Sequence, residues 1–411
     1  MIFKKIAKVS YFCGLDVGTH AIKASLIRAH DADNLELLGV FEVRTTGLKE
    51  ASISDITELA DGINRVMDGL MQKTGIKVDA VQLGLSADLL SSRRSGAIIP
   101  LIDSGTKVIA RSDVQKVNHQ ARLLGAQLDE EIIHDFPQFY KVDDANVALN
   151  PIGLYGRKLE THLLLLVANA VRVRNLTKAV HQAGFEVNQV GFSSYAACQV
   201  AVEKDIREQG CALIDIGAHM TSVLFFKKGM LGDLQFIPWG GSYVTQSIAE
   251  RLSLTVDMAE DIKKAHAVAA KTSPQDNAGE ILVKREKGYM PIRREAVCEA
   301  VNWEIENLLT HLETVVKGSP LYHQLNKGIV MVGGAALLPG LIERIEERTN
   351  LPVVMGATTN GLNNAVVYAG SIGLAQMHYL KQQENIFDIR RAKNFKEGVI
   401  NAFKEVAQEY F

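Results

Sequence analysis

Cysteine is scarce in this chain. The 411 residues include only four cysteines, which lie far apart and form no Cys-x-x-Cys pair. This spacing argues against a zinc site or a disulfide framework and fits a reducing compartment. We expect Cys13, Cys198 and Cys211, which lie in apolar runs, to be buried.

Long hydrophobic runs are also missing. The longest, Leu163 to Ala168, has the length of a strand, whereas a transmembrane helix needs about 20 apolar residues. The lysine-dotted segment Met1 to Ser10 shows neither the apolar stretch nor the cleavage site of a signal peptide. We therefore expect a cytoplasmic protein without a membrane span.

An excess of charge of one sign is absent too. The formal net charge is -2, from 45 Lys and Arg against 47 Asp and Glu. No global basic field favours a nucleic acid, so we expect no nucleic-acid partner. The length predicts two to four domains, and a composition of 47% hydrophobic and 22% charged residues is ordinary for a globular protein.

The chain does contain a repeated strand-turn pattern. The apolar run from Tyr11 leads into Leu15-Asp16-Val17-Gly18-Thr19, and Cys211-Ala212-Leu213-Ile214-Asp215-Ile216-Gly217 repeats the pattern in the second half. Two further apolar segments follow each turn, which predicts a three-strand antiparallel meander. The repetition predicts two related lobes.

Each Asp-x-Gly turn is suited to phosphate. Glycine lets the backbone approach a ligand closely, and the N–H groups of such a turn form an anion-binding concavity. Asp16 and Asp215 are candidate magnesium ligands, and Gly18, Thr19 and Gly217 are candidate phosphate contacts. The second turn continues as Ala218-His219-Met220 with no further glycine, and we interpret His219 as a turn residue rather than a catalyst.

A third glycine pair follows a later strand. Gly333-Gly334-Ala335 comes after the apolar run Gly328 to Val332, and we expect this loop to open a helix, as nucleotide contacts often do. A helix is also predicted over Ser54 to Lys73, with Ser54 as its N-cap, and another over Ser193 to Glu208.

Together these loops resemble the superfamily of actin, sugar kinases and heat-shock ATPases, and within it the bacterial cell-division family FtsA. The resemblance implies an adenosine loop at Val332 to Gly340 and ATP with Mg²⁺ as ligands. It also implies contacts to the ribose and adenine from Glu260 and Lys263, in an Ala-Glu-x-Ile-Lys motif, and a contact from Gly241 in Trp239-Gly240-Gly241.

A segment of different texture interrupts the first lobe. Its runs Ile132 to Tyr140 and Asn150 to Gly156 resemble subdomain 1C of FtsA, which actin lacks. The resemblance assigns no chemistry to His134, which we expect to be structural. The implied fold is a two-lobed α/β actin-like (ribonuclease H-like) protein with a 1C insertion and a C-terminal amphipathic helix. We expect subdomain 1A at 11–88, 165–200 and 362–381, 1C at 89–164, 2A at 201–245 and 327–361, 2B at 246–326, a linker at 382–393 and the helix at 394–411.

The last eighteen residues have an apolar stripe at helical spacing. Its members are Phe395, Val399, Phe403, Val406 and Tyr410. Such a helix on a polar linker predicts binding at the inner face of the membrane, of moderate strength because its polar face carries charges of both signs. The alternative is a helix docked on the body of the protein.

The resemblance implies an ATP-binding adaptor that forms filaments and captures the C-terminal peptide of the tubulin-like FtsZ through subdomain 2B. Phe192 to Cys198, ahead of the second loop, contains no Gln or Glu to position water, so we expect weak or absent ATP hydrolysis. Two alternatives remain: a type IV pilus scaffold of the PilM kind, and a sugar or metabolite kinase, for which no general base stands out.

Overall fold

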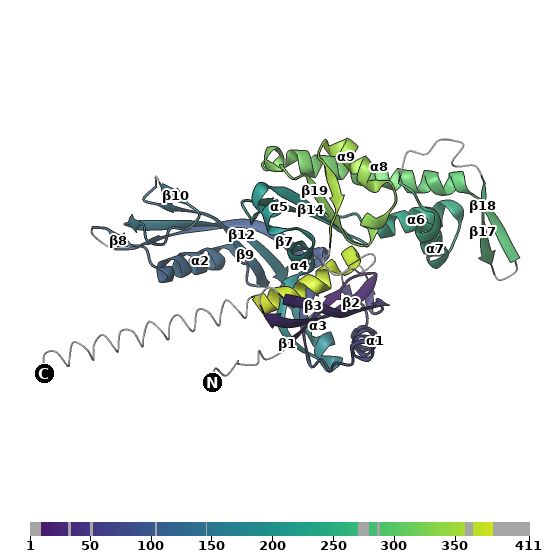
Figure 1. Ribbon diagram of the computed structural model, residues 1–411, viewed down its shortest axis with the longest axis horizontal. Coiled ribbons are helices and arrows are strands. Elements are labelled where there is room, and N and C mark those ends of the chain that lie inside the picture. The colour runs from purple at the N-terminus through teal and green to yellow at the C-terminus, as the bar shows by residue number, and fades with distance from the viewer. Residues whose placement is uncertain are drawn as a thin grey trace, which may run out of the picture.

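The computed structural model describes residues 10–31, 34–49, 52–102, 105–144, 146–269, 279–285, 288–357 and 365–380. Two lobes lie against each other, an elongated insertion projects from one side and a small hairpin from the other (Figure 1). The predicted linker at 382–393 and helix at 394–411 lie outside the described residues. Within those residues, no helix combines the length and apolar character needed to cross a membrane.

The first lobe is built on a five-stranded sheet in the order β13-β6-β1-β2-β3. Its strands are β1 (Ser10–Val17), β2 (Ala21–Asp31), β3 (Asn34–Arg44), β6 (Ala80–Leu85) and β13 (Glu186–Phe192). The first three form an antiparallel meander, while β6 runs parallel to β1 and β13 parallel to β6. Helices α1 (Ile56–Thr74) and α3 (Ala170–Gln182) cover one face, and a helix over 369–380 packs on the other. The short strands β4 (Leu48–Lys49) and β5 (Ser52–Ile53) pair before α1.

The second lobe repeats this sheet. Its order is β16-β15-β14-β19-β20, with the same antiparallel meander followed by two parallel strands. The strands are β14 (Cys211–Ile216), β15 (Thr221–Lys227), β16 (Met230–Ile237), β19 (Ile329–Val332) and β20 (Val353–Met355). The predicted duplication into two related lobes, each opening on a meander, is confirmed.

A helical part of the second lobe lies between β16 and β19. It contains α6 (Gly241–Leu252), α7 (Val256–His266), α8 (Arg294–Gly318) and the hairpin of β17 (Glu280–Arg285) and β18 (Gly288–Arg293), which projects at the far right of Figure 1. Helix α9 (Leu341–Thr349) is tied to α8 by Arg344, whose Nη1 donates to Asn302 Oδ1 at 2.9 Å and whose Nη2 pairs with Glu306.

The insertion is a four-stranded sheet with one helix on it. The sheet order is β10-β9-β12-β7, from β7 (Leu90–Pro100), β9 (Glu130–Val142), β10 (Asn146–Ala148) and β12 (Lys158–Asn169). Helix α2 (Arg111–Gly125) packs on β7 and β12, and β8 (Lys107–Val108) pairs with β11 (Tyr155–Gly156). The insertion also contacts the second lobe, because Gln138 Nε2 donates to Leu231 O at 2.9 Å and Arg94 Nη2 to Gly232 O at 3.2 Å.

Strand β12 belongs to three buried clusters. Leu163, Leu165 and Val167 lie in the core of the insertion, Leu164 and Leu166 lie in the cluster between the lobes, and Ala168 lies in the core of the first lobe. The strand therefore ties the insertion to both lobes.

Three local expectations need correction. The cap of α1 is Asp55 rather than Ser54, since its carboxylate accepts from the N–H groups of Thr57 and Glu58. The helix predicted over Ser193 to Glu208 is two helices, α4 (Ser193–Ala201) and α5 (Lys204–Gln209). The loop after β19 opens into a 3-10 turn, η3 (Ala335–Leu337), before α9 begins. The other 3-10 turns are η1 (Ala87–Leu89), η2 (Tyr322–Gln324) and η4 (Ala365–Tyr368).

Cys13, Cys198 and Cys211 are buried, as predicted, and Cys298 is buried as well. Burial raises the pKa of the Cys13 and Cys211 thiols to about 12, so these thiols stay protonated. They behave as small apolar side chains in the core.

Candidate functional site

A cleft of about 1040 Å³ lies between the two lobes. Its wall combines the β1–β2 hairpin of the first lobe with the β14–β15 hairpin, α6, α7 and the loop after β19 of the second. All eleven predicted ligand contacts lie on this wall: Asp16, Gly18, Thr19, Asp215, Gly217, Gly241, Glu260, Lys263, Gly333, Gly334 and Ala335. The structure thus brings together residues from five separate stretches of sequence, although their role in binding stays a prediction.

The first hairpin presents one carboxylate and a polar tip. Ser193 Oγ donates to Asp16 Oδ1 at 2.6 Å, which fixes the carboxylate at the end of β1. Gly18 N–H closes the hairpin on Ala21 O at 3.2 Å. Among the described residues, the N–H groups of Thr19 and His20 have no backbone partner. They are the unpaired donors that a phosphate-binding turn needs.

The second hairpin is anchored on α6. Its Gly217 N–H donates to Met220 O at 3.0 Å, and the carbonyls of Gly217 and Ala218 accept from the N–H groups of Gly241 and Ser242 at 2.9 and 2.8 Å. A Cβ on Gly240 would lie 2.4 Å from Ala218 O, so only glycine fits there. The first donors of α6 are therefore engaged by the hairpin and are not free for a ligand.

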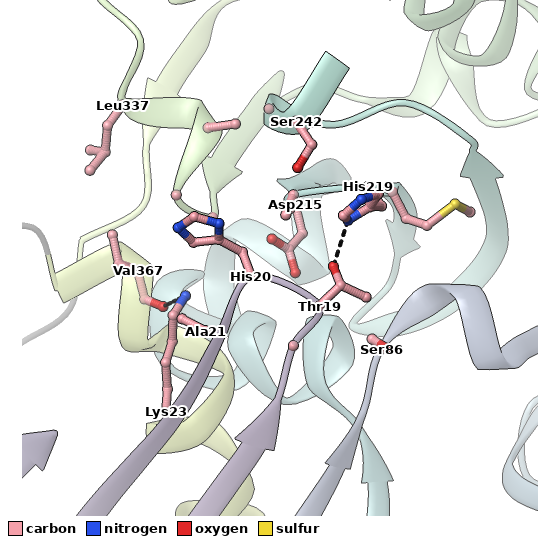
Figure 2. Close-up of a pocket in the computed structure, with 18 of the residues that line it drawn as sticks. Thr19, His20, Ala21, Lys23, Ser86, Asp215, His219, Ser242, Leu337 and Val367 are labelled. Carbon is pink, nitrogen blue, oxygen red and sulfur yellow. Dashed lines mark hydrogen bonds between the residues drawn. The ribbon is translucent and has the colours of Figure 1, made fainter. Parts of the chain in front are cut away.

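Asp215 lies at the bottom of the cleft, where it is enclosed by both lobes. Burial raises the pKa of this carboxyl; a hydrogen bond from Ser194 lowers it, the charge of Asp16 raises it further, and Lys23 lowers it. A cation bound here would relieve the buried charge of the ionised Asp215 beside Asp16. Figure 2 shows Asp215 directed into the space between the hairpins.

These two carboxylates fit a magnesium ion of the kind that accompanies nucleotides. Mg²⁺ keeps several waters and is usually held by one or two carboxylates together with phosphate oxygens. In the described part of the chain, no cluster of three or more His, Cys, Asp or Glu side chains has metal-binding geometry. Asp16 and Asp215 would therefore hold the ion jointly with a bound phosphate rather than alone.

Lys23 is a cleft residue that the sequence motifs did not identify. It lies on β2, opposite Asp16 in the β1–β2 register, and its Nζ donates to Val367 O at 2.9 Å. Figure 2 shows the ammonium reaching up from β2 to the carbonyl. A lysine beside two carboxylates and two hairpin tips supplies the positive charge that phosphate requires. The feature that could have identified Lys23 is its cross-strand register, because it is the β2 residue that faces Asp16 of the motif.

The loop after β19 forms the other end of the cleft. Gly333 has φ +94°, and a Cβ there would lie 2.5 Å from Asp215 Oδ1, so this position requires glycine. Gly334 has ordinary helical angles, and a Cβ on it would meet nothing within 4 Å. Its backbone faces open space, bordered by Leu337, Leu338 and Pro339. This apolar border beside exposed backbone suits a planar base.

Glu260 and Lys263 form a compact network with Thr245. Lys263 Nζ lies 2.7 Å from Glu260 Oε2 and 2.8 Å from Thr245 Oγ1, and it also donates to Gly241 O at 3.1 Å. Burial opposes the ionisation of Glu260, but hydrogen bonds from Lys263 and Thr245 outweigh it and lower the pKa to about 2. Burial lowers the pKa of Lys263, and the Glu260 contact opposes that change. The predicted pair is therefore a charged cluster on the cleft wall.

Several side-chain contacts cross the cleft between the lobes. Thr19 Oγ1 and His219 Nδ1 share a hydrogen bond of 2.8 Å between the two hairpin tips, as Figure 2 shows. His20 Nε2 lies 4.0 Å from Glu260 Oε1; burial lowers the pKa of this imidazole. At the mouth, Arg44 Nη1 donates to Asp257 Oδ1 at 2.7 Å. His219 lies in a turn, as predicted. Its hydrogen bond to Thr19 was not predicted.

Two other residues lie away from the cleft wall. Gln199 accepts a hydrogen bond from Arg207 Nη1 at 2.5 Å and does not line the cleft. His134 Nε2 accepts from the N–H of Phe192 at 3.0 Å, and its ring packs on Phe136 and Tyr195. The structural role predicted for His134 fits these contacts.

Two family models match this chain. The model described as "Cell division protein FtsA" matches residues 212–373, and the "SHS2 domain inserted in FTSA" matches residues 89–167, which is the insertion. The chain is 27% identical to the cell division protein FtsA of Pseudomonas aeruginosa over 382 residues, covering 91% of this chain and 90% of the relative. It is 29% identical to FtsA of Streptococcus pneumoniae over 342 residues, covering 83% and 74%.

Solved structures share the fold at low identity. The PilM-PilN type IV pilus biogenesis complex aligns with a TM-score of 0.63 and 15% identity, covering 89% of this chain and 97% of that one. An MreB protein of Spiroplasma citri bound to AMPPNP aligns with a TM-score of 0.51 and 14% identity, covering 94% and 98%. These likenesses show an actin-like fold and no more. The two matched models, over residues 89–167 and 212–373, and the FtsA relatives aligned along most of the chain show that it belongs to the FtsA family of cell division proteins.

Proposed function

We propose that this protein binds ATP with Mg²⁺ between its lobes and that the nucleotide promotes its assembly into filaments on the inner membrane. The single observation that carries the proposal is the cleft, where the two hairpins, the glycine loop and the Glu260–Lys263 pair all converge. Unpaired N–H groups, Lys23 and two carboxylates supply phosphate and magnesium ligands at one end. Exposed backbone at Gly334 with an apolar border supplies a base site at the other.

The chemistry of the site favours binding over turnover. When bound, Mg²⁺ would neutralise phosphate charge between Asp16 and Asp215. Ser193 holds the Asp16 carboxylate and Lys23 provides the cation opposite it. Gln199 is turned toward Arg207 rather than into the cleft, so it is not placed to orient a water. We infer an ATP-dependent switch with weak or absent hydrolysis.

The output that we propose is adaptor function in cell division. Membership in the FtsA family supports a peripheral protein on the cytoplasmic face, anchored by residues 394–411, that tethers the C-terminal peptide of FtsZ through the helical part of the second lobe. The likeness to PilM concerns the fold, so capture of a pilus peptide is kept as an outcome of the test rather than as a second proposal.

Nucleotide binding is tested by titrating the purified protein with ATP by calorimetry, with and without Mg²⁺. We expect binding that depends on Mg²⁺ and that Asp16→Ala weakens about tenfold or more, because a charge-assisted contact is worth about 1.5 to 3 kcal/mol. Gly334→Asp should also weaken it, since a carboxylate would project into the cleft. Gly334→Ala is the matched control, because a Cβ there meets nothing.

The proposal fails if the wild-type protein binds no ATP, or if Asp16→Ala and Gly334→Asp both bind it as tightly as the wild type. Equal loss in Gly334→Ala and Gly334→Asp would assign the effect to the backbone rather than to the charge.

A further inference from the structure

We propose that His219 recognises the terminal phosphate of the bound nucleotide, and that this phosphate takes the place of the direct hydrogen bond between His219 and Thr19. The inference rests on the proposed ATP binding and goes one step further: it makes His219 the residue that distinguishes a triphosphate from a diphosphate. It also makes one contact between the lobes depend on which nucleotide is bound.

The position of His219 is fixed by its hairpin. Gly217 N–H bonds Met220 O and closes the turn, and the carbonyls of Gly217 and Ala218 are held by the first two N–H groups of α6. Gly240 lets α6 approach this closely, since a Cβ would overlap Ala218 O. The tip therefore cannot shift without disrupting α6, and the imidazole is presented to the cleft from a rigid support.

Several donors of the second hairpin are used within the protein, although the N–H groups of Ala218 and His219, like those of Thr19 and His20, have no backbone partner among the described residues. Its glycine N–H is used inside the turn, and the N-terminal donors of α6, which would ordinarily attract an anion, are spent on hairpin carbonyls. The imidazole is the side-chain donor that this hairpin presents at the level of Thr19. A histidine at this position compensates for the missing glycines of the turn.

The Thr19–His219 contact is a pairing that a phosphate can replace. A single hydrogen bond of 2.8 Å joins Thr19 Oγ1 and His219 Nδ1, so only one of the two groups donates to the other. Phosphate oxygens only accept, so the hydroxyl and an imidazole N–H can each donate to them, and such charge-assisted bonds are about twice as strong as neutral ones. Of the phosphates of ATP, the terminal one lies farthest from the base and extends to the hairpin tips. A diphosphate ends short of it and leaves the direct bond in place.

The replacement would couple nucleotide state to the lobes. Thr19 belongs to the first lobe and His219 to the second, and Asp16 and Asp215 flank the same gap. With the triphosphate, the two hairpin tips are joined through the ligand; with the diphosphate, they are joined by the direct Thr19–His219 hydrogen bond. A switch between these states is what an assembly triggered by ATP requires.

The test compares affinities for AMPPNP, a non-hydrolysable triphosphate, and ADP, measured with Mg²⁺ by calorimetry. We expect His219→Ala to weaken AMPPNP about tenfold while ADP changes less than about twofold. His219→Asn places an amide near the Nδ1 position and should restore most of the preference, whereas His219→Gln, with its amide one bond farther out, should not. Exposed His311→Ala on α8 is the matched control.

A second readout follows the lobes directly. A fluorophore pair on exposed Asp61 and Thr314, one in each lobe, should report different energy transfer with AMPPNP and with ADP in the wild type, and equal transfer in His219→Ala. If AMPPNP and ADP both bind the wild type but His219→Ala leaves their affinity ratio unchanged, the His219 inference is wrong and the proposed ATP binding stands. If the wild type binds neither nucleotide, the proposed function itself is wrong. Thermal melting without nucleotide shows whether each variant is folded.

Discussion

Asp215 illustrates how a candidate ligand residue can destabilise the protein that carries it. Burial and the neighbouring Asp16 raise the pKa of its carboxyl. A group whose folded pKa is raised favours the folded state below its ordinary pKa, and this contribution is lost as the pH rises through the folded value. At neutral pH the ionised Asp215 therefore opposes folding in the absence of a cation.

Asp215→Asn should accordingly raise the melting temperature of the ligand-free protein at pH 7, by about 1 to 3 °C, because the amide keeps the acceptor without the charge. The difference should shrink as the pH falls, because the raised pKa lets the wild-type carboxyl gain its proton above its ordinary pKa. Added Mg-ATP should stabilise the wild type more than the variant. Scanning calorimetry measures all three, with exposed Asp68→Asn on α1 as the control. A variant that melts lower than the wild type at pH 7 would contradict this account.

Residues of the site were predictable where a local motif demands them. The Asp-x-Gly turns identify Asp16 and Asp215 because the turn needs glycine and the strand end places the carboxylate. Sequence reasoning did not identify Lys23 or His219 as candidate ligand contacts. Lys23 faces the cleft through its cross-strand register with Asp16, and His219 contacts Thr19, two hundred positions away in the sequence. Local sequence patterns carry no signal for contacts between such distant residues.

At the scale of elements, the helix over 369–380 supports the cleft from beneath. It packs on β1 so closely that a Cβ on Gly14 would lie 1.9 Å from Ser371 O. Ser371 Oγ also bonds Ser25 Oγ at 2.5 Å, and Gly370 brings the helix start within reach of Asp16. The placement of Asp16 therefore depends on a helix from the far end of the described chain.

Gly14→Ala should push this helix off the sheet. Overpacking of this kind costs about 1 to 3 kcal/mol, and the displaced helix should weaken ATP binding in the same variant. Urea unfolding and calorimetric titration measure the two effects. Gly318→Ala, at the end of α8, adds the same methyl group where it meets nothing within 4 Å and should leave both unchanged. If Gly14→Ala is as stable as Gly318→Ala, the close approach does not constrain the fold.

The elements themselves were largely predictable from periodicity. The two meanders follow from apolar runs of strand length separated by glycine turns, and α1 from its spacing of apolar residues. Boundaries were less predictable: Asp55 and Ser54 are both good caps, and only the three-dimensional turn selects Asp55. The 3-10 turn after β19 has no periodic signal of its own, because three residues are too few.

For the whole molecule, the duplicated lobes were predictable because the motif recurs. How the lobes meet was not, since the buried cluster between them joins residues of α4, β12, β14 and β15 that no local pattern relates. The predicted membrane helix lies outside the described residues and remains a prediction with its own test.

Deleting residues 394–411 should release the protein from liposomes that contain anionic lipid. The apolar stripe that would insert is removed, and the described body offers no membrane-spanning helix to replace it. Co-sedimentation measures the bound fraction. In the full chain, Phe403→Ser should weaken binding and Gln408→Ser, off the stripe, should not. If the truncated and full-length proteins sediment equally with the liposomes, residues 394–411 are not the membrane anchor.

The proposed partner peptide of FtsZ can be mapped on the helical part of the second lobe. Trp303 on α8 is 65% exposed, beside the Arg251 guanidinium at 5.4 Å. Exposed tryptophan and arginine are the side chains that most often anchor a bound peptide. Trp303→Ala should therefore weaken an FtsZ tail peptide about tenfold or more in fluorescence anisotropy. Tyr155→Ala, an aromatic residue equally exposed on the insertion, should not.

Failure of the wild-type protein to bind the FtsZ peptide, together with capture of a peptide from a pilus membrane protein, would replace the division adaptor by a PilM-like scaffold. If Trp303→Ala leaves peptide binding unchanged, the adaptor function stands but the docking site lies elsewhere than at Trp303.

The position of strand β12 in three buried clusters has a consequence for how this protein unfolds. Its twelve residues supply apolar side chains to the insertion, to the first lobe and to the cluster between the lobes. Unfolding the insertion alone would expose Leu164 and Leu166 and leave a void between the lobes, which costs several kcal/mol for side chains of this size. We therefore expect the insertion to unfold together with the lobes rather than as a detachable module, so that losing its sheet would also disrupt the cleft.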